Sequence, residues 1–413
     1  MSLQPVRGTH DLLQNEMQLH RIVSDTACKI AGFYGYREVD TPIFEFTEVF
    51  SRTLGDASDI VTKEMYTFND KSHESVTLRP EYTAGIARMF MSNGLLRNIP
   101  FKTFSRGPMF RYERPQKGRQ RQFHQINVEV LGSEGPVSDI EVISLGAHIL
   151  DELGLKGDIV LELNTLGDSD SRKVYRDCLV QYFKDHRSKL SKESLLRLEK
   201  NPLRILDSKD QSDKALVQNA PLFTESLNSQ SKEFFLELTE GLEALGISFI
   251  RNPRLVRGMD YYCHTAFEFT TKSLGAQGAV LAGGRYDGLM AKMGGASVPG
   301  IGWAAGIERL AMMIAAPSDL PRPISVVPVN EDAQIVGLQI VDRLRRANFF
   351  IDYAYSGTLK KRLAKANKSQ AKVAILIERN KVTEGFIILR DMETGEQVES
   401  SLTSLEEDLL RYR

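Results

Sequence analysis

Arginine, acidic and aromatic residues surround a basic loop between Phe104 and Gly132. Apolar and polar residues alternate on both flanks, and Pro115–Gly118 interrupts them, which predicts an antiparallel hairpin with a long tip. Guanidinium and ammonium groups bind phosphate oxygens, and the face of Phe123 can stack on a base. These residue types indicate a polyanionic partner that carries a base. The basic residues of this segment are Arg111, Arg114, Lys117, Arg119 and Arg121.

Several segments of the chain are similar to motifs of one family. The hairpin resembles motif 2 of class II aminoacyl-tRNA synthetases, and GIGWAAGIERL at 300–310 resembles their motif 3. LVRGMDYY at 255–262 and AGGRYDGL at 282–289 resemble the two histidine-specific signatures of histidyl-tRNA synthetases. With RGTHDLL at 7–13 and TLRPEYTAG at 77–85, the resemblance spans nearly the whole chain. It implies a ligase that activates L-histidine with ATP to histidyl-adenylate and pyrophosphate, then transfers histidine to the 3′ end of tRNA(His).

Three arginines are implied to bind the phosphates of ATP. Activation of an amino acid gathers negative charge on phosphoryl oxygens, so it needs positioned cations more than a base. The resemblance places Arg111 at the α-phosphate and the histidine carboxylate, Arg257 at the α-phosphate, and Arg309 at the γ-phosphate. Arg111 and Arg257 are therefore the expected catalytic residues, and ATP is expected as its Mg²⁺ complex. Glu113 is implied near the adenine amino group and Phe123 on the base; an ion pair or a core aromatic is the alternative for each.

The resemblance also implies a pocket for histidine. Carboxylates and a phenol can accept hydrogen bonds from imidazole and ammonium N–H groups, and Glu129 and Tyr262 match the positions that face the imidazole. The implied histidine-binding residues are Glu81, Thr83, Arg111, Gln125, Glu129, Arg257, Tyr261 and Tyr262. Gly283 and Gly284 would let backbone approach a ligand closely, although a tight turn is nearly as good an interpretation. A lone His on a hairpin is more often structural, so no catalytic role is expected of His124.

Two basic segments are expected to contact tRNA. The motif 2 loop should meet the acceptor end, and the basic face of a helix near residue 358 should meet the anticodon stem, with a solvated lysine face as the alternative. The expected contacts are Gln116, Lys117, Arg119, Arg121, Lys360, Lys361 and Arg362. Three positions depart from the family pattern: Tyr82, Gln120 and the segment Glu378–Lys381.

Composition bounds the class of protein. The 413 residues carry a net charge of −1, so nucleic-acid contact must come from local patches. Cys28, Cys178 and Cys263 are widely separated, which argues for a reducing compartment and against a disulfide framework or protein-bound zinc. The N-terminal residues lack the apolar core of a secretory signal, and no apolar stretch is long enough to span a membrane. We expect a cytoplasmic protein with no membrane partner.

The order of elements predicts an α+β catalytic domain of the class II type, with a mostly antiparallel sheet flanked by helices. We expect its first part at 1–167, a helical insertion at 168–250, its second part at 251–318 and an α/β anticodon-binding domain at 323–413. A helix at Gln14–Ala31 and a strand at Tyr36–Phe46 broken by Pro42 are implied by the resemblance to form a homodimer surface; an ordinary edge strand is the alternative. Ser138–Glu141 has the pattern of a capping box.

Three prolines between residues 316 and 323 indicate a boundary, and beyond it strands alternate with helices. This alternation predicts a small, largely parallel α/β domain. The expected strands are 324–329, 350–355, 373–377 and 386–389, and the expected helices are 332–347, 358–367 and one from 404.

Two other functions fit parts of the pattern. One is the histidine-sensing regulatory subunit of ATP phosphoribosyltransferase, which resembles the catalytic core but lacks the C-terminal domain and loses key arginines. The other is a nucleic-acid-binding module without catalysis, which would not need both histidine signatures and the ATP arginines. This chain keeps Arg111, Arg257, Arg309 and a full C-terminal segment, so both alternatives are disfavoured.

Overall fold

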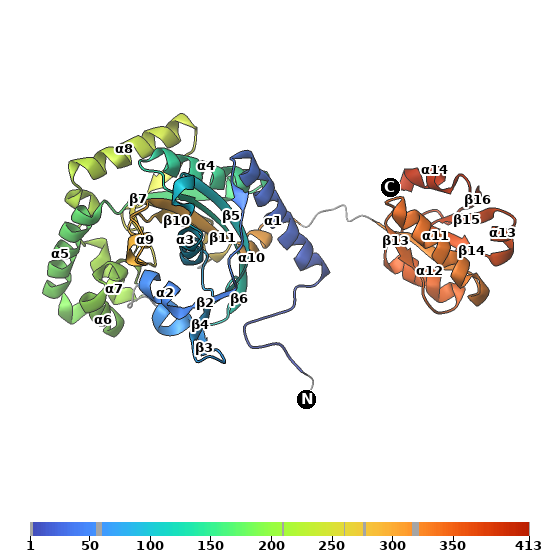
Figure 1. Cartoon of the computed structure of the whole chain (residues 1–413), viewed down its shortest axis with the longest axis horizontal. Helices are drawn as coiled ribbons and strands as arrows, with labels where there is room; N and C mark the ends of the chain where they lie inside the picture. The colour runs from blue at the N-terminus through green and yellow to red at the C-terminus, as the bar shows by residue number, and fades with distance from the viewer. Residues whose placement is uncertain are drawn as a thin grey trace. The chain divides into compact units, whose positions relative to one another are not determined.

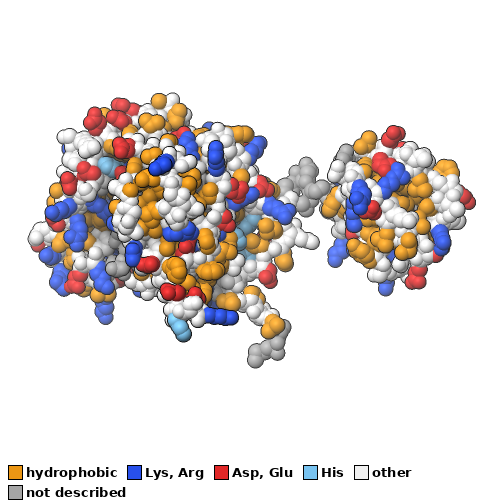
Figure 2. All heavy atoms as spheres, in the orientation of Figure 1, with side chains coloured by type: hydrophobic (Ala, Val, Ile, Leu, Met, Phe, Trp, Pro, Cys, Tyr) orange, Lys and Arg blue, Asp and Glu red, His pale blue; other side chains and the backbone are white. Residues whose placement is uncertain are grey.

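Two compact units make up the chain in this computed structural model, residues 1–315 and 316–413 (Figure 1). The structure describes residues 3–54, 60–208, 210–259, 261–275, 278–315 and 322–412. Most of the proline-rich boundary expected between 316 and 323 lies outside these ranges. On the face drawn in Figure 2, acidic and basic side chains are interspersed. No helix in the described ranges is both long and apolar enough to cross a membrane.

An eight-stranded sheet forms the centre of the first unit. Only its two edge pairs, β1 with β5 and β7 with β8, are parallel, so the predicted mostly antiparallel sheet is confirmed. In spatial order its strands are β1 (Arg37–Glu38), β5 (Phe101–Phe110), β6 (Gln122–Leu131), β11 (Gly300–Gly306), β10 (Ala279–Arg285), β9 (Cys263–Thr270), β7 (Val160–Thr165) and β8 (Phe249–Arg251).

The two faces of this sheet have different neighbours, and β6 shows why. Side chains alternate between faces along a strand. Ile126, Val128 and Val130 pack in one apolar core with residues of helices α1 (Gln14–Phe33) and α4 (Val137–Glu152). The residues between them on β6 point to the opposite face, which belongs to a second core. The polar site described below therefore lies on the face away from α1 and α4.

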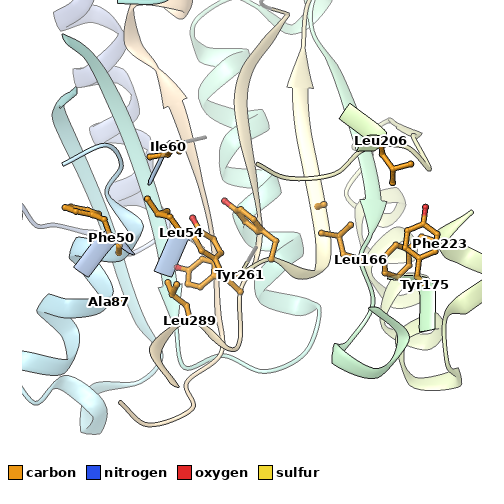
Figure 3. Packing of buried hydrophobic residues seen from close by; sticks show 14 of the residues in the cluster. Phe50, Leu54, Ile60, Ala87, Leu166, Tyr175, Leu206, Phe223, Tyr261 and Leu289 are labelled. Carbon is orange, nitrogen blue, oxygen red and sulfur yellow. The ribbon is translucent and has the colours of Figure 1, made fainter. Parts of the chain in front are cut away.

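The second core runs without a break from the catalytic sheet into the helical insertion. Figure 3 shows Tyr261 and Leu289 beside Phe50 and Leu54, with Tyr175 and Phe223 further along the same cluster. The remaining helices of the catalytic part are α2 (Thr47–Leu54), α3 (Thr83–Ser92), α9 (Leu289–Lys292) and α10 (Ile307–Ala311).

The insertion follows β7 and returns to the sheet through β8, so it extends from that edge (Figure 1). Its helices are α5 (Ser169–Asp185), α6 (Lys192–Lys200), α7 (Gln211–Gln218) and α8 (Ser229–Ala244). Each begins after a residue whose side chain accepts a hydrogen bond from a backbone N–H of the first turn. Such caps satisfy amide groups that a helix start leaves unpaired. The capping residues are Asp168, Ser191, Asp210 and Asn228.

Two predictions of local structure in the first half of the chain were wrong. The single strand expected at Tyr36–Phe46 is split: β1 joins the large sheet, whereas β2 (Phe44–Phe46) joins β4 (Ser75–Leu78) and β3 (Tyr66–Asn69) in a separate sheet. Pro42 lies between the two pieces, as its missing N–H favours. The capping box is also absent, because Ser138 lies inside α4 and its hydroxyl donates to the carbonyl of Gly135.

The second unit is a mixed five-stranded sheet, in the order β13 (Ile351–Tyr353), β12 (Ile324–Pro328), β14 (Val373–Ile377), β15 (Phe386–Asp391) and β16 (Gln397–Ser401). The first three strands are parallel, but β15 and β16 are antiparallel, which corrects the largely parallel sheet expected. Neither β16 nor the short helix α13 (Arg379–Thr383) was predicted. The other helices are α11 (Gln334–Arg346), α12 (Leu359–Lys368) and α14 (Leu405–Leu409).

A buried ion pair between Arg285, at the end of β10, and Asp139 is expected to stabilise the first unit. Its guanidinium and the Asp139 carboxylate are 1% and 0% exposed, and the two approach to 2.5 Å. Arg285→Leu should lower the free energy of unfolding by about 3–5 kcal/mol, because it leaves an uncompensated buried carboxylate. Urea denaturation measures the change. Arg346→Leu is the matched control, because its partner Asp342 is exposed and the pair should contribute little; similar losses in both variants would contradict this account.

Candidate active site

Four alternating residues of β6 share the face of the sheet that carries a pocket: Phe123, Gln125, Asn127 and Glu129. All but Glu129 line it, together with residues of β10, β11 and the segment before β9. Strand β11 lies directly against β6 and pairs Gly302 with Glu129. A side chain at Gly302 would overlap Glu129 Oε2 and the Val128 carbonyl. Only glycine at position 302 therefore leaves room for the carboxylate of Glu129 on this face of β11.

Three arginines gather at one end of the pocket. Arg111 donates through Nε to the Pro80 carbonyl at 2.9 Å, and Arg309 donates to the carbonyls of Gly118 (3.2 Å) and Ala279 (2.7 Å). Burial lowers the pKa of Arg309, and the positive charges of Arg119 and Arg111 lower it further. Like charges held this close repel, so an anion bound among them would be stabilised. This end is suited to a polyphosphate.

Glu113 and Phe123 lie beside the same arginines. The guanidinium carbon of Arg111 is 5.3 Å from the centre of the Phe123 ring, and Arg119 Nη1 is 3.1 Å from Glu113 Oε2. Both Phe123 and Glu113 line the pocket. The structure thus brings together the four residues predicted to bind ATP, with Arg119 as an additional member that was assigned to tRNA.

Arg257 lies across the pocket, between the sheet and the insertion. Its Nη1 donates to Glu268 of β9, and its guanidinium carbon lies 5.4 Å from the centre of the Tyr262 ring. The Nε group is buried and has no hydrogen-bond partner among the described residues. The pair with Glu268 is the structural alternative for this arginine, yet one N–H group is left to bind a ligand. Arg257 also lines a wider hollow toward the insertion, with Arg111 and Arg119.

Glu129 lies at the centre of a buried hydrogen-bond network at the other end. Its Oε1 accepts from Thr83 Oγ1 at 2.5 Å and from Asn127 Nδ2 at 3.1 Å, and its Oε2 accepts from the Tyr286 hydroxyl. Only 1% of Glu129 is exposed. Burial raises the pKa of Glu129 to about 7, although these three donors oppose the shift. Its carboxyl group can therefore gain or lose a proton near neutral pH.

Glu81 and two tyrosines complete this end. Glu81 accepts from the backbone N–H groups of Thr83 (3.0 Å) and Ala84 (2.8 Å), which begin α3. Burial raises the pKa of Glu81 and of the Tyr261 and Tyr262 phenols. The rings of the two tyrosines lie 4.6 Å apart. Every residue predicted to bind histidine thus lies in or directly beneath one pocket.

The predicted tRNA contacts of the motif 2 loop differ in how exposed their side chains are. Gln116 and Lys117 are exposed at the hairpin tip, where a backbone bridge joins Gln116 to Arg119. In contrast, Arg119 lines the pocket, and the Arg121 guanidinium lies 3.7 Å from the centre of the Tyr112 ring. Gln116 and Lys117 are therefore the two more exposed members of this set.

One predicted tRNA contact of the second unit is wrong. Arg362 is 3% exposed and donates through Nη1 to the Pro328 carbonyl. It lies on the inward face of α12, so its charge supports the fold and cannot reach a phosphate at the surface. Lys360 and Lys361 on the same helix are exposed, and their expected role stays a prediction.

The second signature region has a structural role that neither sequence interpretation anticipated. Gly283 and Gly284 lie within β10, and a side chain at either would overlap the neighbouring strands, at Gly302 and Thr265. The glycines therefore permit close approach of the strands, and they lie inside a strand rather than in a tight turn.

Sequence reasoning missed the partners of the predicted residues. Asn127 and Tyr286 hold Glu129, and the Glu308 carboxylate contacts His124. Asn127 could have been found, because it shares the period-two face of β6 with Gln125 and Glu129. No local pattern would have paired Tyr286 with Glu129, since they are far apart in the chain.

The pocket also offers polar groups that suit the substrates implied by the sequence. Gln125 Oε1 is buried without a hydrogen-bond partner among the described residues, as is Arg257 Nε. Such orphaned groups are costly unless a ligand satisfies them. An amine could donate to the first and an anion could accept from the second, so the residues fit an amino acid next to a phosphate.

Comparisons with known proteins agree with this geometry. Residues 8–310 match the family model for histidyl-tRNA synthetase, and residues 324–412 match that for an anticodon binding domain. The chain is 55% identical over 412 residues to a histidine–tRNA ligase of Rhodospirillum rubrum, covering 100% of this chain and 99% of the relative. A counterpart from Gluconobacter oxydans is 51% identical over 403 residues, or 98% and 97% of the two chains. The apo histidyl-tRNA synthetase of S. aureus has a TM-score of 0.82 at 32% identity, covering 98% of this chain and 99% of that chain.

The raised pKa of Glu129 predicts how its substitution changes stability with pH. From the ordinary pKa of 4.5 up to about 7, the folded protein keeps a proton that the unfolded chain releases. Wild-type stability therefore falls across this window relative to Glu129→Gln, which has no proton to lose. Between pH 4.5 and pH 8 the difference in unfolding free energy should move in favour of the variant by about 3 kcal/mol. Urea denaturation at both pH values measures it; a difference that does not change with pH would show that Glu129 ionises normally.

Proposed function

The chain belongs to the histidyl-tRNA synthetase family, and we propose how its pocket divides the work of an ATP-dependent histidine–tRNA ligase. Such an enzyme joins histidine to ATP as an adenylate and then transfers it to tRNA. One observation carries the assignment of the site: buried acidic and phenolic groups lie at one end of a single pocket, and a cluster of arginines lies at the other. A zwitterionic amino acid bound next to a triphosphate has matching charges.

ATP binds at the arginine end in this proposal, as its Mg²⁺ complex. Phe123 stacks on adenine, and Glu113 accepts from the adenine amino group. Arg309 binds the γ-phosphate, supported by its contacts with the Gly118 and Ala279 carbonyls. Arg119, which lines the pocket beside Glu113, adds charge for the phosphates.

Histidine binds at the acidic end. Glu129 and Tyr262 contact the imidazole, and Glu81, Thr83 and Gln125 surround the α-ammonium group. Arg111 then holds the histidine carboxylate against the α-phosphate, and Arg257 binds the charge that develops there. A pocket lined by buried hydrogen-bonding groups rejects amino acids that would leave those groups unpaired.

Transfer to tRNA follows from the same site. The acceptor end approaches along the hairpin tip, where Gln116 and Lys117 are exposed. The adenylate's own phosphate oxygen is a sufficient proton acceptor for the ribose hydroxyl, so no side chain is required as a base. Lys360 and Lys361 contact the anticodon stem from the second unit. We infer further that the enzyme is a homodimer through its N-terminal helix and strand and that it works in the cytoplasm.

Arg257 gives the sharpest test of the catalytic assignment. Arg257→His should leave the binding of histidine and ATP nearly intact, because the contact is strongest in the transition state. Single-turnover adenylate formation should slow by roughly 100- to 1000-fold, which is typical when one preorganised contact is lost.

Glu268→Gln is the control for the structural alternative. If Arg257 serves only as the partner of Glu268, both variants should melt early and still form adenylate at near-normal rates. Retained adenylation in Arg257→His would therefore defeat its catalytic role, whatever the melting temperature.

Glu129→Ala tests the division between the two ends of the pocket. It should raise the KM for histidine far more than the KM for ATP in pyrophosphate exchange, because an imidazole partner is lost. Phe123→Ala should do the reverse, because it removes the stacking surface for adenine. Equal changes in both constants for Glu129→Ala would indicate that Glu129 is only structural, and exchange without a requirement for histidine would reject the substrate assignment.

A further inference from the structure

The ladder between β6 and β11 ends at Gln125 opposite Gly306, because the chain turns into α10 at Ile307. His124, the next residue of β6 in the outward direction, has no strand partner on that side. The carboxylate of Glu308 replaces it. The His124 backbone N–H donates to Glu308 Oε1 at 2.8 Å and Oε2 at 3.0 Å, and ring Nδ1 lies 2.8 Å from Oε1. We call these three contacts the His124–Glu308 clasp.

The clasp joins the chain neighbours of two predicted ATP contacts, although the His124 ring points to the opposite face of β6 from Phe123. Phe123 precedes His124 on β6, and Arg309 follows Glu308 on α10. Each side chain is therefore one peptide unit from the clasp. Loss of the clasp would free the start of α10 to move relative to the end of β6, and the distance between Phe123 and Arg309 would change with it.

His20 of α1 covers the outer side of the clasp. Its ring is 5.3 Å from that of His124 at an angle of 79°, and the residue is 7% exposed. Burial lowers the pKa of His20, and His124 also lowers it, whereas Glu308 raises it. His20 is thus held toward its neutral form, and its ring packs edge-on against that of His124.

We propose that His124 and Glu308 are positioning residues that set the spacing of Phe123 and Arg309 for ATP. The inference rests on the proposed function, because it takes those two residues as the adenine and γ-phosphate contacts. Ligand atoms of His20, His124 and Glu308 lie within 4.8 Å of one another, a spacing that a metal ion could also use. Both oxygens of Glu308 already accept from His124, which favours a hydrogen-bonded clasp over a metal site.

Pyrophosphate exchange by full-length variants tests the proposal. Glu308→Ala removes all three contacts and should raise the KM for ATP by about tenfold, while the KM for histidine changes by less than about twofold. His124→Ala removes only the ring contact, because the backbone N–H remains, and should raise the KM for ATP by a smaller factor. His124→Asn keeps an N–H near the position of Nδ1 and should recover most of the ATP affinity. A purely structural role would reduce the amount of active enzyme without separating the two constants, and that result would overturn the proposal.

Phe123→Ala and Arg309→Gln separate a failure of this inference from a failure of the proposed function. If they raise the KM for ATP but the clasp variants do not, the clasp is wrong and the ATP site stands. If they too leave it unchanged, the ATP site itself is wrong. Metal analysis of the purified protein completes the test: stoichiometric zinc that disappears in His20→Ala would replace the clasp with a metal site.

Discussion

The close contact between β6 and β11 is the constraint on which the rest of the structure depends. Gly302 leaves room for the Glu129 carboxylate, and the same pairing places Gln125 opposite Gly306, where motif 3 turns into its helix. One strand thereby carries the aromatic, amide and carboxylate groups of the pocket on a single face. Its opposite face supplies apolar residues to the core under α1 and α4. A shift of one residue in this register would exchange the two faces and bury the polar groups in the wrong core.

Much of the site was predictable because the sequence presents it locally. The alternation of β6 indicates which residues share a face, and the family resemblance supplies their chemistry. The same rule of periodicity could have prevented the error at Arg362. Leu359, Leu363 and Ala366 are spaced with it on one side of α12, and this side packs on the sheet. The prediction counted the basic residues of that segment without placing them on the helix. Helical spacing puts the exposed lysines and the buried arginine on different faces.

What the sequence could not provide is contact between distant segments. Tyr286 meets Glu129 only because β11 of motif 3 lies between β6 of motif 2 and β10, the strand that leads into Tyr286. Strand β16 has the polar sequence QVESS and pairs through its backbone at a sheet edge, so it lacks the apolar alternation that predicts a strand. The split of Tyr36–Phe46 depends likewise on which sheet each half joins. These features come from pairing between distant segments, and composition and periodicity contain little information about such pairing.

The two ends of the pocket each hold charged or ionisable groups whose arrangement is unfavourable when no substrate is bound. Arginines clustered at one end repel, and buried carboxyl groups at the other have raised pKa values, so each end is costly by itself. A triphosphate relieves the first, and an ammonium or imidazole N–H relieves the second. Substrates that carry both kinds of charge satisfy the whole pocket at once. The protein therefore holds its charges in place before the reaction begins. The free-energy cost of placing them is met when the chain folds, so no solvent has to reorganise during the reaction.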